Sequence, residues 1–217
     1  MISKSNAQPI KTEGQPDRLV QILKVVVWPA ALLLILLVFK GTSVPKDIEL
    51  NEKGIKISFY LLQAVESGGP DGKPPEAPPN TKAIQDVARK ASAISLDKAK
   101  VLWVDDNPQN QEYERNALSA LGVTFVQARS TSEALPLLQS QQFALVITDF
   151  KRVDDERAGY TLLKRVQSLK NPPPLIIYSG SASPEFAAEA KRLGAFAETN
   201  QPQQLFSLAV EAIVRPR

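Results

Sequence analysis

The sequence predicts an α/β fold, a doubly wound five-stranded parallel sheet preceded by a single transmembrane helix. Short apolar runs alternate five times with helical segments between about residue 99 and the end of the 217-residue chain. This alternation is typical of a parallel sheet covered by helices on both faces. The uncharged run Val25–Phe39 lies earlier in the chain and, with its apolar flank, has the length of a bilayer-spanning helix.

The composition excludes several kinds of chemistry. The chain has no His and no Cys, which rules out Ser-His-Asp and Cys-His catalysis, zinc sites built on these ligands, and disulfides. Its 26 basic and 23 acidic residues give a formal net charge of +3. That excess is too weak for a dedicated nucleic-acid binder, so we expect no nucleic-acid partner. Carboxylates, hydroxyls, lysines and arginines are left to carry the function.

The N-terminal region predicts a tail and a membrane anchor. Residues 1–18 are polar without apolar periodicity and predict a disordered tail. Residues 19–40 predict a transmembrane helix of roughly 30 Å. A buried core helix and a cleaved signal peptide are the alternatives, but the segment is apolar on all sides and no A-x-A-like cleavage site follows it. Basic residues are balanced on its two sides, so charge does not orient the span.

The region between the anchor and the sheet is less regular. Residues 44–66 predict a short juxtamembrane β-hairpin, because Ile55, Ile57 and Phe59 alternate with polar residues after a turn-like segment. Residues 67–81 are rich in proline and glycine and predict a semi-extended linker. Residues 82–96 predict an amphipathic helix, which either docks on the following domain or pairs with a second copy of the chain.

Residues 97–217 predict one domain with a flavodoxin-like sheet, because right-handed crossovers between parallel strands lead to that arrangement. The predicted strands are Val101–Val104, Val123–Val126, Phe143–Thr148, Leu175–Tyr178 and Ala195–Ala197. The predicted helices are Pro108–Leu121, Ser130–Gln139, Tyr160–Leu169, Pro184–Leu193 and Gln203–Val214.

Polar residues follow three of these strands and predict an oxygen-only site. Asp105 and Asp106 follow the first strand, Asp149 follows the third, and Ser179 and Gly180 follow the fourth. Doubly wound sheets bind ligands at the carboxyl ends of their strands. Converging carboxylates with a nearby hydroxyl suit Mg²⁺ and a phosphoryl group. As an alternative, the acidic pair merely caps the next helix, through Asp106 or the adjacent Asn107.

The segments VLWVDDNP, ALVITDF and LIIYSG resemble the receiver domain of bacterial two-component response regulators, in the same order, over roughly residues 99–217. The resemblance implies that Asp149 accepts a phosphoryl group and that Mg²⁺ is the cofactor. It also implies the remaining roles, with Asp105, Asp106, Asp149 and the backbone carbonyl of Lys151 as metal ligands and Ser179 and Gly180 as phosphate contacts.

The segment GAFAETNQP departs from the family pattern. Gln201 stands where receivers have a lysine that pairs with the acceptor aspartate and then with the phosphoryl group. Glu198 stands where their switch aromatic lies, although Phe196 could serve from two positions away. Without the lysine, Mg²⁺ fills the site, or the pKa of one aspartate rises, or Lys151 or Arg152 turns in.

These features predict a membrane-anchored, single-domain signalling protein similar to response regulators, located in the inner membrane with its receiver domain in the cytoplasm. The expected partners are a sensor histidine kinase or phosphotransfer protein, a downstream protein, and the membrane through residues 19–40. The expected output face includes Arg192, Phe196, Glu198 and Gln201. We expect no enzymatic activity beyond the protein's own phosphorylation and dephosphorylation.

Two other functions compete with this interpretation. A phosphorylation-independent receiver-like domain would act as a docking module at the membrane, and Gln201 favours it. A Mg²⁺-dependent phosphohydrolase similar to haloacid dehalogenases would need a second acid two residues after the nucleophile, where this sequence has Lys151. We therefore disfavour the enzyme.

Overall fold

The computed structural model describes residues 51–72, 80–153, 155–180 and 184–216. The predicted tail, the predicted transmembrane helix, the first part of the predicted hairpin and residues 73–79 of the predicted linker lie outside these residues. Within the described ranges, none of the helices combines the length and the apolar character that a membrane crossing requires.

The centre of the fold is a five-stranded parallel sheet in the order β2-β1-β3-β4-β5, which confirms the doubly wound sheet predicted from the sequence. Its strands are β1 (Lys100–Val104), β2 (Thr124–Ala128), β3 (Leu145–Thr148), β4 (Leu175–Tyr178) and β5 (Ala197–Thr199). The residues of β3 and β4 are buried throughout, as expected for central strands covered on both faces.

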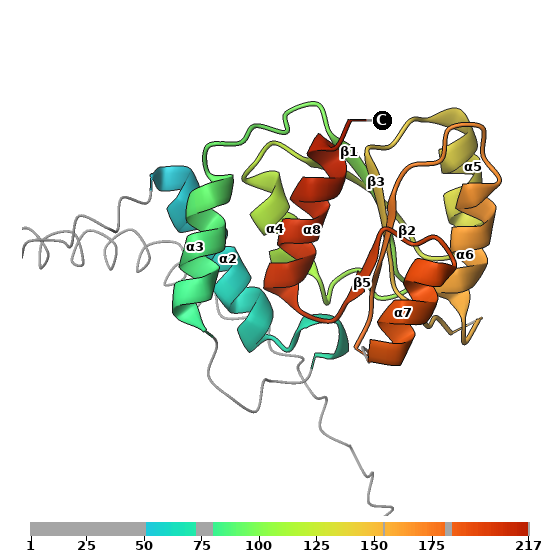
Figure 1. Cartoon of the computed structure of the whole chain (residues 1–217), viewed down its shortest axis with the longest axis horizontal. Helices are drawn as coiled ribbons and strands as arrows, with labels where there is room; N and C mark the ends of the chain where they lie inside the picture. The colour runs from blue at the N-terminus through green and yellow to red at the C-terminus, as the bar shows by residue number, and fades with distance from the viewer. Residues whose placement is uncertain (1–50, 73–79, 154, 181–183, 217) are drawn as a thin grey trace, which may run out of the picture. The chain divides into compact units, whose positions relative to one another are not determined.

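Helices cover both faces of the sheet (Figure 1). On one face, α4 (Glu112–Ser119) and α8 (Pro202–Val214) pack against strand residues that include Val101 and Trp103. On the other face, α5 (Thr131–Ser140), α6 (Ala158–Gln167) and α7 (Pro184–Arg192) pack against residues that include Leu102 and Val104. Neighbouring strand residues therefore enter different cores, as the two-residue period of a strand requires.

The predicted hairpin over residues 44–66 is wrong where the structure describes it, because Glu52–Glu66 form a helix, α2. The side chain of Asn51 caps this helix by accepting a hydrogen bond from the Gly54 amide at 2.8 Å. Ile57, Leu61 and Ala64 are fully buried and lie at helical spacing. The alternation that indicated a strand does not follow one face of this helix, since Ile57 is buried and Ile55 is 45% exposed. Packing against α4 decides between the two structures.

The predicted amphipathic helix is present as α3 (Thr81–Ala91) and docks on its own domain. Its buried residues Ile84, Ala88 and Ala91 belong to the same core as α2, α4 and α8. Between α2 and α3, the short helix η2 (Gly69–Asp71) occupies the described start of the predicted linker. Helices α2 and α3 thus form a third helical layer outside α4 and α8 (Figure 1). Each fully buried Ile or Leu there contributes about 1.5–3 kcal/mol to stability.

Several predicted boundaries in the receiver-like region differ from the structure by two residues or more. Helix α4 begins at Glu112 instead of Pro108. Strand β5 begins at Ala197 instead of Ala195, because Gly194 and Ala195 belong to the turn that follows α7. Gly194 adopts a φ of +89°, and the Ala195 amide donates to the Ala190 carbonyl at 2.9 Å. The chain therefore joins the sheet two residues later than the sequence predicts.

Candidate functional site

The register of the sheet brings Asp105 and Asp149 together at its carboxyl edge. Val104 and Thr148 are partners at the ends of β1 and β3, and each is followed directly by one of the two aspartates. The Asp149 amide donates to the Val104 carbonyl at 3.0 Å. The neighbouring carboxylates therefore emerge from adjacent central strands, as the sequence predicts.

Both carboxylates have perturbed pKa values. Burial raises the pKa of Asp149 to about 7, with a further rise from the charge of Asp105. Burial also raises the pKa of Asp105, which is 5% exposed and whose Oδ1 accepts a hydrogen bond from the Asn107 amide at 2.7 Å. Asp149 Oδ1 accepts one from the Phe150 amide at 2.6 Å. A buried and a partly buried carboxylate that repel each other are arranged to gain from a cation.

Asp106 and Lys151 lie nearer the surface. Asp106 Oδ2 accepts a hydrogen bond from the Val153 amide at 2.9 Å, which ties the acidic pair to the loop after β3. The Lys151 ammonium lies 2.6 Å from Glu156, with both side chains mostly exposed. Lys151 thus does not turn toward the carboxylates. The alternative of a simple helix cap is wrong, because α4 starts after Gln111, well beyond the acidic pair.

Ser179 follows β4 at the same edge. Its side chain is 4% exposed, and its amide donates to the Thr199 carbonyl at 3.1 Å. Since Thr148 pairs with Ile177, Ser179 lies just beyond the level of Asp149. Gly180 follows it at the partly exposed rim. The structure therefore places a hydroxyl on the strand next to the acceptor, as predicted.

Gln201 does not take the place of the family's lysine. Its side chain is exposed, and its Oε1 accepts a hydrogen bond from Gln203 Nε2 at 3.1 Å. Its amide donates to Thr199 Oγ1 at 3.1 Å. Gln201 directly precedes α8. Its side-chain amide is uncharged, so it brings no positive charge to the aspartates.

The donor set fits Mg²⁺ in chemistry, since it consists of carboxylate oxygens and a backbone carbonyl. Asp105 and Asp149 are adjacent and gain from a positive charge. Across the described ranges, however, no three Asp, Glu, His or Cys side chains already converge as a metal site would require. Asp106 Oδ2 accepts from the Val153 amide, which leaves its Oδ1 as the oxygen that would turn to a metal.

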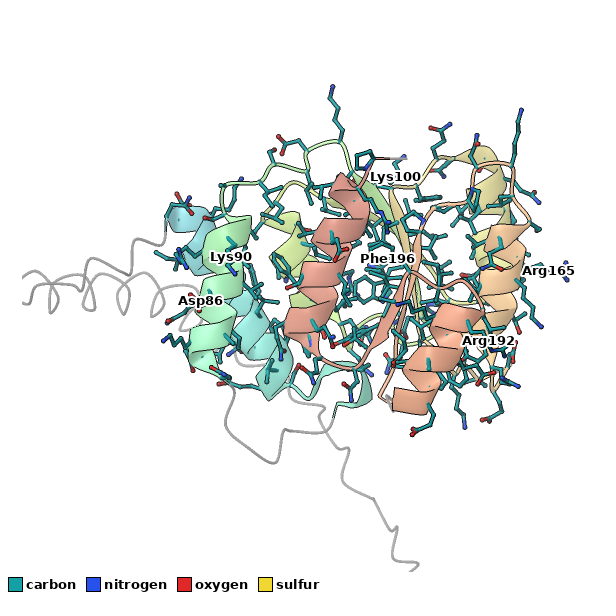
Figure 2. All side chains as sticks on the ribbon, in the orientation of Figure 1. Asp86, Lys90, Lys100, Arg165, Arg192 and Phe196 are labelled. Carbon is teal, nitrogen blue, oxygen red and sulfur yellow. The ribbon has the colours of Figure 1, made fainter. Side chains whose placement is uncertain are left out.

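The residues predicted for the output face lie in different settings. Figure 2 shows Arg192 at the outer surface of α7 and Phe196 beside the sheet. The Phe196 amide donates a hydrogen bond to the Leu175 carbonyl at the start of β4, which is the end of the strand away from Ser179. The Arg215 guanidinium lies over the Phe196 ring. Glu198 lies on β5 and is half-buried, and burial raises its pKa to about 7. Phe196 is thus badly placed to serve as the switch aromatic.

Sequence reasoning missed Gly159 near Asp149 and named Arg152 only as one of two cations that could turn in. Arg152 does turn in: it is buried at 2% exposure, and its charge favours the ionised forms of Asp105 and Asp149. Gly159 opens α6 so close to the acceptor that an added Cβ would lie 3.0 Å from Phe150 Cα and 3.2 Å from the Asp149 carbonyl oxygen. The residue spacing carries no signal for either position, because both depend on how the loop after β3 folds back.

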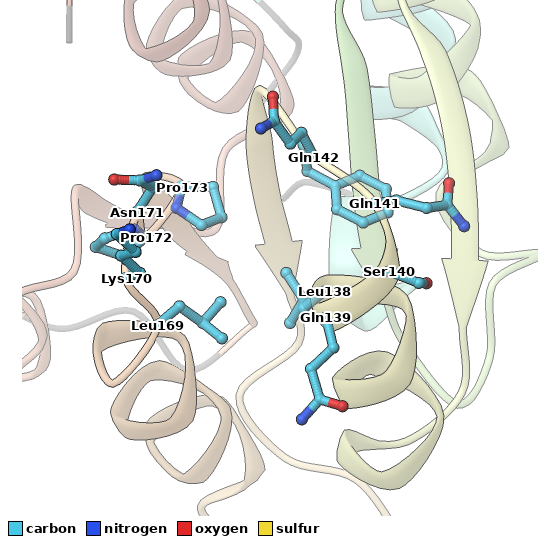
Figure 3. Close-up of a pocket in the computed structure, with 11 residues that line it drawn as sticks. Leu138, Gln139, Ser140, Gln141, Gln142, Leu169, Lys170, Asn171, Pro172 and Pro173 are labelled. Carbon is cyan, nitrogen blue, oxygen red and sulfur yellow. The ribbon is translucent and has the colours of Figure 1, made fainter.

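A sizeable surface hollow lies away from the carboxylates. It measures about 920 Å³ and is bounded by the segments 138–143 and 169–173, which follow α5 and α6 (Figure 3). These segments lead into β3 and β4, so the hollow lies at the amino ends of the strands. Volume alone therefore does not locate the site, whereas the aspartates do.

Comparison with known proteins identifies this arrangement. Residues 101–205 match the family model of the response regulator receiver domain. The response regulator protein PilR of Pseudomonas aeruginosa is 28% identical over 110 residues, which cover 51% of this chain and 24% of PilR. The chain thus spans about a quarter of the length of this curated relative.

Solved receiver structures are also similar. The chemotaxis response regulator CheY4 of Vibrio cholerae is 25% identical, with a TM-score of 0.46, over 54% of this chain and 98% of that chain. The non-phosphorylated HemR receiver domain of Leptospira biflexa is 24% identical, with a TM-score of 0.47, over 55% of this chain and 98% of that chain. Residues 101–205 thus match the receiver-domain family, and Asp105, Asp106, Asp149 and Ser179 lie together at the sheet edge as that resemblance predicts.

Proposed function

We propose that the protein is a membrane-anchored response-regulator-like signalling protein that accepts a phosphoryl group on Asp149 with Mg²⁺ and signals through protein–protein contacts. The observation that carries the proposal is the adjacent pair of buried Asp105 and partly buried Asp149 at the carboxyl edge, with Ser179 directly after the next strand. Asp149 is the member of this set that follows the central strand β3.

The residues have distinct roles in the proposed reaction. An ionised Asp149 oxygen attacks the phosphorus of the donor, the bond from phosphorus to the donor's leaving group breaks, and the leaving group departs with the electron pair. The Ser179 hydroxyl donates to a phosphoryl oxygen. Asp105, Asp106 and the Lys151 carbonyl are the groups that would hold Mg²⁺, which supplies charge neutralisation when bound. Hydrolysis of the acyl phosphate returns Asp149 and inorganic phosphate, so no separate substrate is turned over.

The proposed partners follow from this chemistry. A sensor histidine kinase or phosphotransfer protein supplies the phosphoryl group, and a downstream protein binds at the face built by α7, β5 and α8. The apolar residues 19–40 anchor the chain in the inner membrane. Phosphodonors are cytoplasmic, so the receiver domain lies on that side. A reporter fused after Arg217 that is active only outside the cytoplasm would contradict this topology.

Phosphoryl acceptance is tested with the full chain, Mg²⁺ and acetyl phosphate. Intact-mass measurement should find one added phosphoryl group on the wild type and none on Asp149→Asn. A wild type that stays unmodified, and that also binds no Mg²⁺ by calorimetry, would contradict the proposal.

A docking module that never receives phosphate is the second candidate. Two contacts favour it, since Gln201 is bonded to Gln203 and Asp106 to the Val153 amide. In both contacts, a side chain near the phosphorylation site, Gln201 or Asp106, is bonded to a neighbouring part of the protein. Binding of the downstream partner by Asp149→Asn at wild-type affinity, with and without acetyl phosphate, would favour this candidate.

A further inference from the structure

Arg152 is a buried cation beside the acceptor. Its guanidinium donates from Nη1 to Thr148 Oγ1 at 2.7 Å and to the Asp149 carbonyl oxygen at 3.3 Å. From Nη2 it donates to Thr131 Oγ1 at 2.8 Å and to the Ala158 carbonyl oxygen at 3.1 Å. A charged side chain that is 2% exposed needs such a set of oxygens, because burial of a charge is otherwise costly.

The oxygens that hold Arg152 come from three elements around Asp149. Thr148 ends β3, Thr131 opens α5, and Ala158 opens α6. The guanidinium therefore fixes the peptide of the acceptor against the first turns of two helices. Since the donated bond goes to the Asp149 carbonyl oxygen, the Asp149 carboxylate is left to face the acidic edge.

The charge of Arg152 acts on the carboxylates of both Asp105 and Asp149. It favours the ionised form of Asp105 and of Asp149, opposing the rise in pKa that burial causes. Lys151, the adjacent cation, lies at the surface with Glu156 instead. Of the basic side chains described, Arg152 is the one that acts on both carboxylates.

We propose that Arg152 is a positioning residue for phosphoryl acceptance, which supplies the buried positive charge that Gln201 does not and holds the backbone of Asp149 in place. This inference rests on the proposed function. Because Thr131 and Ala158 hold the guanidinium, we expect it to keep these hydrogen bonds when Asp149 is phosphorylated. Arg152 thus offsets negative charge at the site without binding the phosphoryl group directly.

The loop around Arg152 has backbone bonds that do not need the guanidinium. The amides and carbonyls of Arg152 and Asp155 bond to each other at 3.1 and 3.0 Å, and the Val153 amide bonds to Asp106. A substitution of the side chain can therefore leave the turn in place. This makes it feasible to separate the charge of Arg152 from a purely structural role.

The test compares wild-type full chain with Arg152→Met, Arg152→Lys and the control Lys151→Met, which removes the adjacent exposed cation. One measurement is the rate of phosphorylation by acetyl phosphate at saturating Mg²⁺, read by intact mass. The other is the dissociation constant of Mg²⁺ without donor, read by calorimetry. Thermal melts set a temperature at which every variant is folded.

In Arg152→Met, the affinity for Mg²⁺ should rise while the phosphorylation rate falls. Arg152→Met should bind Mg²⁺ about fivefold more tightly, because a repelling charge is gone. Its phosphorylation rate should fall about tenfold or more, because charge building on the transferred group is less stabilised. Arg152→Lys should recover much of both effects, and Lys151→Met should change each by less than twofold.

Other results would overturn the inference. An unchanged phosphorylation rate in Arg152→Met would overturn it. A loss of both the rate and the Mg²⁺ affinity in both Arg152 variants would also overturn it, because that result indicates a purely structural role. If the wild type takes no phosphoryl group, the proposed function fails, but tighter Mg²⁺ binding by Arg152→Met alone still supports the charge placement. A wild type without phosphorylation or Mg²⁺ binding overturns both proposals.

Discussion

The Tyr178 hydroxyl donates a hydrogen bond of 2.7 Å to Glu114 Oε1, and both residues are buried between β4 and α4. Tyr178 is the residue directly before Ser179 in the chain. A Cβ added at Gly69 of η2 would lie 3.1 Å from the same hydroxyl. The end of β4 is therefore held by α4 on one side and by the segment between α2 and α3 on the other.

Glu114 should make stability depend on pH. Burial raises its pKa from 4.5 to about 7, so the folded protein binds a proton that the unfolded chain releases between these values. The free energy of unfolding should therefore fall as pH rises from about 4.5 to 7. Glu114→Gln keeps an acceptor for Tyr178 and should be more stable than wild type at pH 8 by roughly 2 to 3 kcal/mol.

Urea unfolding of Glu114→Gln and wild type at pH 5 and pH 8 checks this prediction. The two proteins should differ much less at pH 5, where Glu114 is protonated. Equal slopes of stability against pH in the two proteins would contradict it. The exposed Glu112→Gln on the same helix is the matched control and should change stability by less than about 0.5 kcal/mol at either pH.

Substitution of two glycines in the segment after α2 should distinguish the stability cost of backbone strain from the cost of a clash near the end of β4. Gly69 has a φ of +58° and lies against Tyr178 and Asn200, whereas Gly72 has a φ of +61° and an added Cβ there would meet nothing within 4 Å. Gly72→Ala should cost about 1 kcal/mol through strain alone. Gly69→Ala should cost about 1 kcal/mol more, because the added methyl group must displace the end of β4 or the β5–α8 loop. Equal losses in urea unfolding would show that η2 does not support this edge.

Helix α2 should be part of the domain's cooperative core. Leu61 is fully buried among residues of α4 and α8, so Leu61→Ala should cost about 2–5 kcal/mol. Ile55 lies on the same helix and is 45% exposed, so Ile55→Ala should cost under about 1 kcal/mol. Chemical unfolding followed by Trp103 fluorescence measures both. If Leu61→Ala costs as little as Ile55→Ala, the outer helical layer unfolds separately from the sheet.

The sequence predicts those parts of the molecule that depend on local pattern. The apolar runs around Trp103 and Ile147 identify central strands, and the acidic residues that follow them fall at one edge whatever the details of packing. Helix α2 could not be recognised, because Ile55, Ile57 and Phe59 fit a strand equally well, and the helix α4 that decides the matter lies about sixty residues further on. Long-range packing, not local preference, settles such a segment.

The sequence names Arg152 as a cation that could turn in, but its full burial could not be predicted, for a related reason. Arg152 lies in a charged loop, and three consecutive acidic residues follow it two positions later. Such a sequence predicts an exposed side chain, because charged side chains are rarely buried. The oxygens of Thr148, Thr131 and Ala158 that receive the guanidinium come from three separate elements. Only the folded arrangement brings them together, so no spacing rule would have found the site.

The acceptor itself should titrate near neutrality when no metal is bound. Burial and the neighbouring charge of Asp105 raise the pKa of Asp149 from 3.8 to about 7. Gln201→Lys, at the family's lysine position, should lower this pKa by about one unit, because a positive charge near the acidic edge favours the ionised carboxylate. The substitution should cost little stability, since the Gln201 side chain is exposed.

Carbon-detected NMR of the Asp149 carboxyl group, recorded without Mg²⁺ between pH 4 and pH 9, measures both values directly. Gln203→Lys places the same charge further along α8 and should lower the pKa by less. A wild-type Asp149 that titrates near 4 would show that the carboxylate is better solvated than its surroundings indicate. A pKa near 7 that Gln201→Lys leaves unchanged would instead show that position 201 faces away from the acceptor, and that charge compensation at this edge comes from the side of Arg152.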